Sequence, residues 1–235
     1  DRVRSLMDKS VKVIILNFPH NPTGILFSKM DMEILLTLMT QHDCYVIADE
    51  VYDKFIYADG ISQSPASMSE IREKVITING FSKSFSMTGW RLGYITGPKD
   101  VMEVISYLQL HSATHPCLFA QKGACAAFDL SEEYFKKINE ELFGKAKFLE
   151  KCVFGNQLLN FNTPKSGMFG LLDISRTGFT SGDFAYRLLK EKDVATTPGI
   201  TLGGSWDDHV RISLGTGKEE FEEGVLLLEE FVNEL

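Results

Sequence analysis

Three polar residues, Asn21, Asp49 and Lys83, each follow a short apolar segment that is typical of a buried strand. In the sequence, Asp49 lies 28 positions after Asn21, and Lys83 lies 34 positions after Asp49. Each interval is long enough for one strand–helix–strand crossover. Ligands of open α/β sheets bind beyond the carboxyl ends of the strands, so we expect these three side chains to converge on one site.

An amine, a carboxylate and an amide together suit a pyridine aldehyde cofactor. A lysine forms a Schiff base with an aldehyde, and a carboxylate beside the ring nitrogen keeps this nitrogen protonated, so that the ring accepts carbanion electrons. Each residue alone has a simpler explanation. Asn21 begins an Asn-Pro-Thr-Gly turn, Asp49 is equally suited to cap a helix, and a lysine in a serine-rich loop usually faces solvent. The combination of the three in this order is what points to a cofactor site.

Longer segments around these residues resemble the class I and II aminotransferases, which have fold type I and use pyridoxal 5′-phosphate (PLP). They are residues 17–24 (NFPHNPTG), 48–52 (ADEVY) and 82–94 (SKSFSMTGWRLGY), of which the last is highly specific. Shorter matches follow at residues 164–169 (PKSGMF), 197–199 (TPG) and 210–214 (VRISL). The resemblance therefore covers nearly the whole chain.

The resemblance implies a role for each residue around the cofactor ring. Lys83 matches the lysine that holds PLP as an aldimine and then moves a proton between the substrate Cα and the cofactor. Asp49 matches the partner of the pyridinium nitrogen. Asn21 and Tyr52 match the two donors to the ring phenolate oxygen.

Two arginines are assigned to anionic groups by the same resemblance. Arg91 matches the ligand of the PLP phosphate, for which a planar, always-charged fork is well suited, and Ser82 is a further candidate phosphate contact. Arg211 matches the arginine that binds the substrate α-carboxylate. Fixing this carboxylate orients the Cα–H bond for cleavage.

The resemblance thus implies a PLP-dependent aminotransferase that moves an amino group between an amino acid and a 2-oxo acid through Lys83. Two alternatives stay open: a PLP-dependent carbon–sulfur β-lyase on the same scaffold, and a truncated fragment without catalysis. The second arises because family members begin with a long segment, including most of the phosphate site, that has no counterpart here. Relatives place the site at a subunit interface, which implies a homodimer with residues 111–128 near the neighbour.

The elements that position these residues alternate along the chain. Strand-like segments occupy residues 11–18, 44–48, 75–79 and 92–96, and we expect the first to be buried. Helical periodicity occupies residues 29–42, 100–110, 117–128 and 132–151, with a capping box of Ser28 and Asp31 before the first helix. Residues 58–69 are polar and predict a loop. The pattern predicts an α/β fold with a mostly parallel sheet, in which the fourth strand pairs antiparallel with the third because their connection is short.

The C-terminal part is predicted to be a smaller α+β domain. Strand-like segments lie at residues 157–162, 170–174 and 209–214, and helical ones at residues 182–192 and 218–234. We therefore expect a cofactor-binding portion of the large domain over residues 1–154, including the long helix, and a small domain over residues 155–235.

Composition argues against several other classes of protein. The chain has 235 residues with 24 Lys+Arg and 32 Asp+Glu, a formal charge of −8 that disfavours nucleic-acid binding. No apolar run reaches the roughly 18 residues of a membrane-spanning helix, and we expect a cytoplasmic protein. The four cysteines lie far apart without the spacing of metal ligands, so we interpret them as buried or free thiols and expect no metal.

Overall fold

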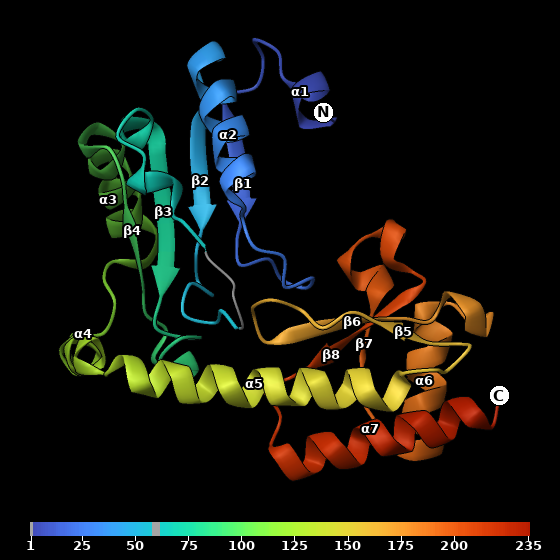
Figure 1. The fold of residues 1–235 in the computed structure, drawn as a ribbon. Helices are drawn as coiled ribbons and strands as arrows, with labels where there is room; N and C mark the ends of the chain where they lie inside the picture. Colours follow the sequence, from blue (N-terminus) through green and yellow to red (C-terminus); the bar gives the residue numbers. More distant parts are fainter. Residues whose placement is uncertain (1, 58–61) are drawn as a thin grey trace. The chain divides into compact units, whose positions relative to one another are not determined.

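The computed structural model describes residues 2–57 and 62–235. The chain divides into two compact units: unit 1 comprises Asp1–Pro19 and Leu26–Phe135, and unit 2 comprises His20–Ile25 and Lys136–Leu235. Each unit contains a four-stranded sheet (Figure 1). The turn that begins at His20 thus belongs with the C-terminal half of the chain, although its neighbours in sequence belong to unit 1.

Unit 1 is built on strands Val13–Asn17 (β1), Tyr45–Asp49 (β2), Val75–Gly80 (β3) and Gly93–Thr96 (β4). They lie in the order β1-β2-β3-β4, with β1, β2 and β3 parallel and β4 antiparallel to β3. The arrows of β1, β2 and β3 point the same way in Figure 1, so their carboxyl ends share one edge of the sheet. The predicted mostly parallel sheet and the antiparallel fourth strand are confirmed.

The helix Lys29–Gln41 (α2) begins with the predicted capping box. The Ser28 hydroxyl accepts a hydrogen bond from the Asp31 amide, and the Asp31 carboxylate accepts one from the Ser28 amide, so two otherwise unpaired amides of the first turn are satisfied. The apolar face of α2, including Met32, lies in one buried cluster with Val46 of β2. Burial of each such side chain stabilises the fold by about 1.5–3 kcal/mol, and this packing holds β2 in place.

Among the described residues β1 pairs with β2 alone, and the prediction that the first strand is buried is wrong for the side chains of β1. Ile15 is 73% exposed and Val13 is 44% exposed, whereas Val46 on the neighbouring β2 is fully buried. An outer strand pairs on one side only, so its apolar side chains are covered less completely than those of an inner strand. A run of Val and Ile in the sequence does not distinguish the two positions.

Unit 1 continues into a helical segment: Lys99–Ala113 (α3), Leu118–Cys125 (α4) and a 3-10 turn over Ala126–Asp129. The helices predicted over residues 100–110 and 117–128 are confirmed. No residue of α3 is buried. In the predicted loop over residues 58–69, residues 58–61 lie outside the described part, and the remainder contains a 3-10 turn over Pro65–Ser67. A short helix, Arg2–Leu6 (α1), precedes β1.

The long helix Glu132–Val153 (α5) belongs to both units. Its first turn lies in unit 1, and from Lys136 onward it belongs to unit 2. Leu142 and Leu149 are among its buried apolar residues, and Lys145 between them is bonded to the chain after the last strand of unit 2. The compact units therefore divide at residues 135 and 136, and the domain boundary expected between residues 154 and 155 stays a prediction.

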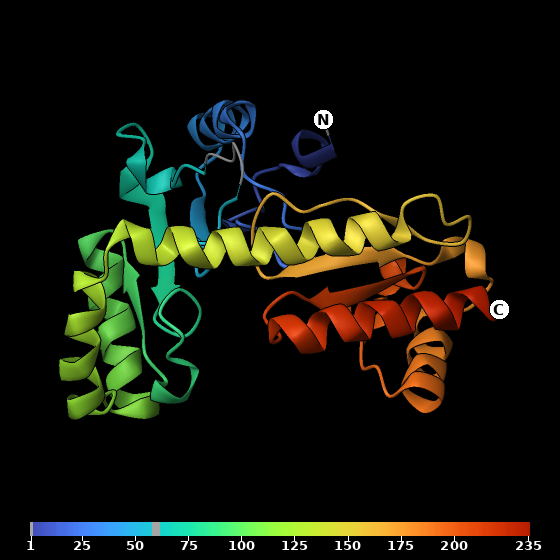
Figure 2. The same ribbon diagram turned by 60° about the horizontal axis from the view of Figure 1, so that its bottom comes forward.

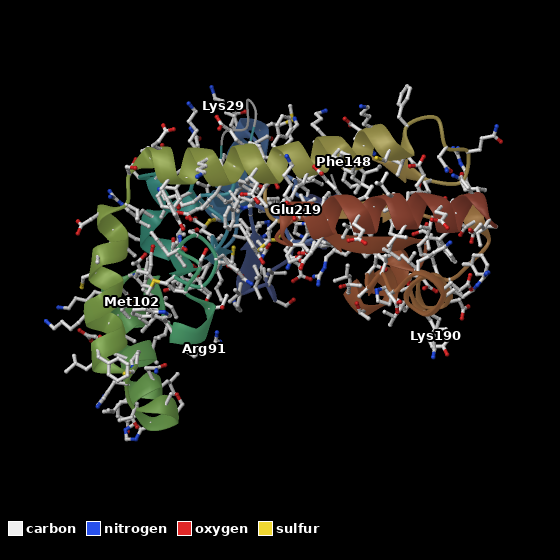
Figure 3. The ribbon with its side chains drawn as sticks, turned by 90° about the horizontal axis from the view of Figure 1, so that it is seen from below. Lys29, Arg91, Met102, Phe148, Lys190 and Glu219 are labelled. Carbon is white, nitrogen blue, oxygen red and sulfur yellow. The ribbon has the colours of Figure 1, made fainter. Side chains whose placement is uncertain are left out.

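Unit 2 contains strands Asn160–Phe161 (β5), Phe169–Asp173 (β6), Thr197–Pro198 (β7) and His209–Ser213 (β8) and helices Ser181–Lys192 (α6) and Lys218–Asn233 (α7). The strand order is β5-β6-β8-β7, and every neighbouring pair is antiparallel. Helices α5 and α7 run side by side along this sheet (Figures 2 and 3). The predicted α+β character is confirmed, although β5 is shorter than expected and β7 was not predicted.

Candidate active site

The carboxylate of Asp49 is held at the carboxyl end of β2. Asn17 lies directly opposite Asp49 in the register of β1 and β2, and its Nδ2 donates to Asp49 Oδ2 over 3.1 Å. The backbone amide of Val51 donates to the other oxygen, Oδ1, over 3.2 Å. Both oxygens therefore have donors, which fixes the orientation of the carboxylate.

Lys83 and Tyr52 are brought together at the same edge of the sheet. Lys83 follows β3, and its Nζ lies 6.0 Å from the centroid of the Tyr52 ring. Tyr52 is only 5% exposed, and Lys83 is half-buried. A half-buried amine beside an aromatic ring differs from the solvent-facing lysine that a serine-rich loop usually provides.

A second contact ties the two loops that carry these residues. Ser84, 1% exposed, donates from its hydroxyl to Asp53 Oδ1 over 3.4 Å. Asp53 also accepts a hydrogen bond from the side chain of Asn79 at the end of β3. Burial raises the pKa of the Asp53 carboxyl, although Lys54 and these hydrogen bonds oppose the rise. Because residues 52–53 and 83–84 are joined in this way, Tyr52 and Lys83 are held as neighbours.

A cavity of about 220 Å³ opens beside the end of β2 within unit 1. Its wall includes Asp49, Glu50 and Asp53, together with apolar side chains such as Phe18 and Phe27, but neither Lys83 nor Tyr52. Burial raises the pKa of Glu50, whose carboxylate accepts a hydrogen bond from Ser64 over 2.6 Å. Typical small-molecule sites have volumes of roughly 300–1,000 Å³. This cavity is smaller, so by itself it does not enclose a cofactor.

Arg91 and Ser82 lie on the segment that connects β3 with β4. Arg91, labelled in Figure 3, is exposed. Its backbone is left-handed, with φ of 53°. Its Nη1 donates to the carbonyl oxygen of Thr88 over 2.9 Å, which leaves further N–H groups of the fork for an anion. Ser82 is half-buried immediately before Lys83.

The remaining two predicted residues meet in unit 2. Arg211 on β8 donates from Nη1 to Asn21 Oδ1 over 3.4 Å and from Nη2 to Thr197 Oγ1 over 3.3 Å. Its guanidinium carbon lies 4.3 Å from the centroid of the Phe169 ring. Thr197 pairs with Arg211 in the register of β7 and β8, and Phe169 belongs to β6, so neighbouring strands on both sides restrain the guanidinium.

The turn that carries Asn21 is fixed by a close approach at Gly24. Gly24 has φ of +65°, and a Cβ added there would lie 2.4 Å from Pro164 Cβ and 2.6 Å from the carbonyl oxygen of Ser166. The buried Ser166 hydroxyl donates to the Gly24 carbonyl over 2.9 Å. Two motifs that are about 140 residues apart in sequence, the Asn-Pro-Thr-Gly turn and the Pro-Lys-Ser-Gly segment, therefore form one structure.

The predicted site residues thus fall into two groups. Unit 1 holds Asp49, Tyr52, Ser82, Lys83 and Arg91, and unit 2 holds Asn21 and Arg211. The convergence of Asn21 with Asp49 and Lys83 stays a prediction. Sequence reasoning assigned no role to Asn17, Asp53 and Thr197. Asn17 and Thr197 belong to the quoted segments 17–24 and 197–199, and Asp53 directly follows the segment 48–52.

Comparisons with known proteins agree with the resemblance. The family model for aminotransferase class I and II matches residues 1–226. The aspartate aminotransferase of Pyrococcus abyssi is 37% identical over 237 residues, covering 100% of this chain and 60% of that protein. The aromatic-amino-acid aminotransferase 2 of Thermococcus litoralis is 33% identical, with the same two coverages. This chain therefore spans about 60% of the length of these curated relatives.

A solved structure shows the same architecture. The crystal structure of the aromatic aminotransferase from Pyrococcus horikoshii OT3 superimposes with a TM-score of 0.93 at 35% identity, covering 100% of this chain and 63% of that one. Among the residues that the structure describes, no helix is both long and apolar enough to cross a membrane.

Proposed function

The chain belongs to the class I and II aminotransferase family, and from this premise we propose that it acts in a PLP-dependent enzyme that transfers an amino group between an amino acid and a 2-oxo acid. The observation that carries the proposal is the half-buried amine of Lys83 next to Tyr52, at the sheet edge where Asn17 and a backbone amide orient Asp49. Relatives named as aspartate and aromatic aminotransferases support the same reaction class.

The donor set in unit 1 fits PLP by its chemistry. An amine, an oriented carboxylate, a phenol and an exposed guanidinium match the aldehyde, ring nitrogen, ring oxygen and phosphate of that molecule. PLP, when bound, supplies an aldehyde that bonds covalently to the amino group and a ring that accepts electrons from the substrate carbon.

Lys83 and Asp49 have the two proton-handling roles. Lys83 would hold the cofactor through its amine and, once released by the substrate, would take the proton from the substrate Cα. Asp49 would hold a proton on the ring nitrogen, a role that requires an ionised carboxylate of fixed orientation. Its two donors, Asn17 Nδ2 and the Val51 amide, provide the fixed orientation.

The other residues bind and orient. Tyr52 and Asn21 would donate to the phenolate oxygen of the cofactor, and Arg91 with Ser82 would bind its phosphate. Arg211 would bind the α-carboxylate of the substrate through its planar fork, and thereby align the Cα–H bond with the ring. The contacts of Arg211 with Thr197 and Phe169 restrain the guanidinium before substrate arrives.

The experiment that tests this proposal begins with PLP and the purified chain. We expect visible absorption from bound PLP, and borohydride reduction should attach PLP to Lys83, as identified by peptide mass spectrometry. Lys83→Ala should lose the attachment, while Lys122→Ala, a lysine on α4, should retain it. Attachment elsewhere, or none, would contradict the assignment of Lys83.

The reaction type is tested separately with substrates. Aspartate or an aromatic amino acid with 2-oxoglutarate should yield glutamate, and cystathionine should not yield pyruvate and ammonia. Pyruvate formation from cystathionine without glutamate formation from the first mixture would indicate a lyase instead.

We also propose a homodimer, with the segment over residues 111–128 near the neighbouring subunit. This proposal is supported by large apolar side chains that α3 and α4 expose: Val104, Tyr107, Leu108, Leu110, Leu118 and Phe119. Exposed apolar side chains gathered on adjacent helices are typical of an interaction surface. Light scattering should give twice the chain mass, and Phe119→Glu should shift the protein toward monomer. The cytoplasmic location stays a prediction that cell fractionation would test.

A further inference from the structure

We propose that Lys145 is a positioning residue, which anchors the carboxyl end of β8 and thereby sets the position of Arg211. Its ammonium group bonds two backbone carbonyls just beyond β8, that of Leu214 over 3.2 Å and that of Thr216 over 2.6 Å. Its third partner is the carboxylate of Glu141, one turn earlier on α5, at 2.7 Å.

The burial of this lysine indicates a specific role. Lys145 is 5% exposed, and removing an ammonium from water is costly unless every N–H finds an acceptor. Lysine has three such donors, and the three acceptors around Lys145 match them one for one. Replacing buried ionic groups by apolar ones is often neutral or stabilising. We therefore attribute to Lys145 a role in fixing the position of its partners and not in raising the stability of the fold.

Among the described residues, the part of β8 after Arg211 pairs with a strand on one side only. On one side β8 pairs with β6 along its length, from His209 to Ser213. On the other side β7 pairs only with Val210 and Arg211, so its support ends at the arginine. Past that point, the Leu214 amide donates to the Met168 carbonyl and the Leu214 carbonyl accepts from Lys145.

The anchor acts on Arg211 through the strand itself. Arg211 lies within β8, which ends at Ser213, and Leu214 is the first residue after the strand, so a shift of Leu214 would be passed along the last two strand residues to Arg211. Such a shift would change the distances from the guanidinium to Thr197, Asn21 and the Phe169 ring together. The inference rests on the proposed function in one respect: Arg211 is taken as the carboxylate-binding residue.

The test compares Lys145→Met with Lys147→Met in the full chain with PLP. Methionine keeps the apolar length of the side chain and removes all three donors. Lys147 lies on the same helix with a half-exposed ion pair to Glu150, so it controls for loss of a charge from α5. We expect Lys145→Met to raise KM for the amino acid and for 2-oxoglutarate about tenfold, with PLP affinity unchanged, and Lys147→Met to leave all three constants unchanged.

A second readout needs neither PLP nor activity. The Nε–H resonance of Arg211 in ¹H–¹⁵N NMR, identified by its loss in Arg211→Lys, should move in Lys145→Met and stay in place in Lys147→Met. Lys145→Gln, which keeps donors for one carbonyl, should give an intermediate shift. If Lys145→Met fails to fold, Lys145→Gln decides by the same criteria.

Two results would overturn the inference. One is a wild-type KM and a wild-type Arg211 resonance in a folded Lys145 variant. The other is a lowered Tm with the resonance unmoved, which would make Lys145 a stability residue only. Failure of the proposed function would be recognised separately, because the wild-type chain would then form no glutamate. The Arg211 Nε–H resonance of the protein without PLP would still test whether Lys145 positions Arg211.

Discussion

Asn17 and Asp49 are register partners on parallel strands, and the amide of the first donates to the carboxylate of the second over 3.1 Å. A hydrogen bond to an ionised group contributes about 1.5–3 kcal/mol. Asn17 therefore orients Asp49, the carboxylate that we propose to pair with the ring nitrogen of PLP.

The first prediction concerns this pair. Asn17→Ala should weaken PLP binding about tenfold to a hundredfold, measured by absorbance titration. Asn17→Asp should weaken it further, because two adjacent carboxylates cannot both ionise easily. Asn162→Ala, at an exposed position after β5, is the control and should bind PLP like wild type. Unaltered binding in both Asn17 variants would remove Asp49 from the cofactor site.

The second prediction is a pH dependence of stability at Asp53. Burial raises the pKa of this carboxyl above the value of 3.8 that it has when unfolded. A raised carboxyl pKa gives stability that is complete below the unfolded pKa and is lost as pH rises through the folded pKa. Asp53→Asn lacks this loss, so its Tm relative to wild type should increase from pH 3.5 to pH 7 in the absence of PLP.

The matched control for Asp53 has the opposite sign. Lys74, 2.7 Å away, lowers the pKa of the exposed Asp43, so the ion pair stabilises above the unfolded pKa and loses its effect as pH falls. Asp43→Asn should therefore have a Tm at or slightly below that of wild type at pH 7, and this difference should become smaller toward pH 3.5. A Tm difference for Asp53→Asn that stays constant across this pH range would show that its carboxyl is not perturbed.

The third prediction isolates the close approach at Gly24. Gly24→Ala introduces a Cβ 2.4 Å from Pro164 Cβ at a backbone φ of +65°, so we expect a loss of about 2–4 kcal/mol in the free energy of unfolding. Gly155→Ala has φ of +83° with no atom within 4 Å of the new Cβ, and should lose only about 1 kcal/mol. Gly144→Ala, inside α5 with open space, should gain about 0.5–1 kcal/mol. Denaturant unfolding measures all three, and equal losses for Gly24 and Gly155 would exclude a steric cause.

The fourth prediction concerns the planar fork of Arg211. Arg211→Lys keeps the charge but loses bidentate binding and the contact with the Phe169 ring. We expect kcat/KM to fall about a hundredfold, mainly through KM, while Arg176→Lys, in a 3-10 turn of unit 2, leaves kcat/KM unchanged. An unaltered KM in Arg211→Lys would assign the substrate carboxylate to another residue.

Local signals in the sequence predicted much of the fold. The capping box of Ser28 and Asp31 forms as expected because it depends on residues within one turn. The antiparallel pairing of β4 with β3 followed from the short connection. By contrast, the exposure of Ile15 depends on which strands lie beside β1, and β7 is a pair of residues too short to leave a periodic pattern.

The site residues show the same limit. Lys83 and Asp49 stand in recognisable motifs, but the motifs do not show that Asn17 Nδ2 and the Val51 amide orient the Asp49 carboxylate. In the sequence, Lys145 is one of several lysines on a charged helix. Its burial depends on carbonyl groups about 70 residues further along the chain. No spacing rule connects such partners, so only the folded arrangement identifies them.

The grouping of His20–Ile25 with the C-terminal half has an evolutionary consequence. Recombination between related genes could replace only the region after residue 135. Gly24 would then face new side chains, whereas the segment His20–Ile25 that contains it would remain unchanged. The two regions should therefore be inherited as a set, and chimaeras that exchange both should fold more readily than chimaeras that exchange either one.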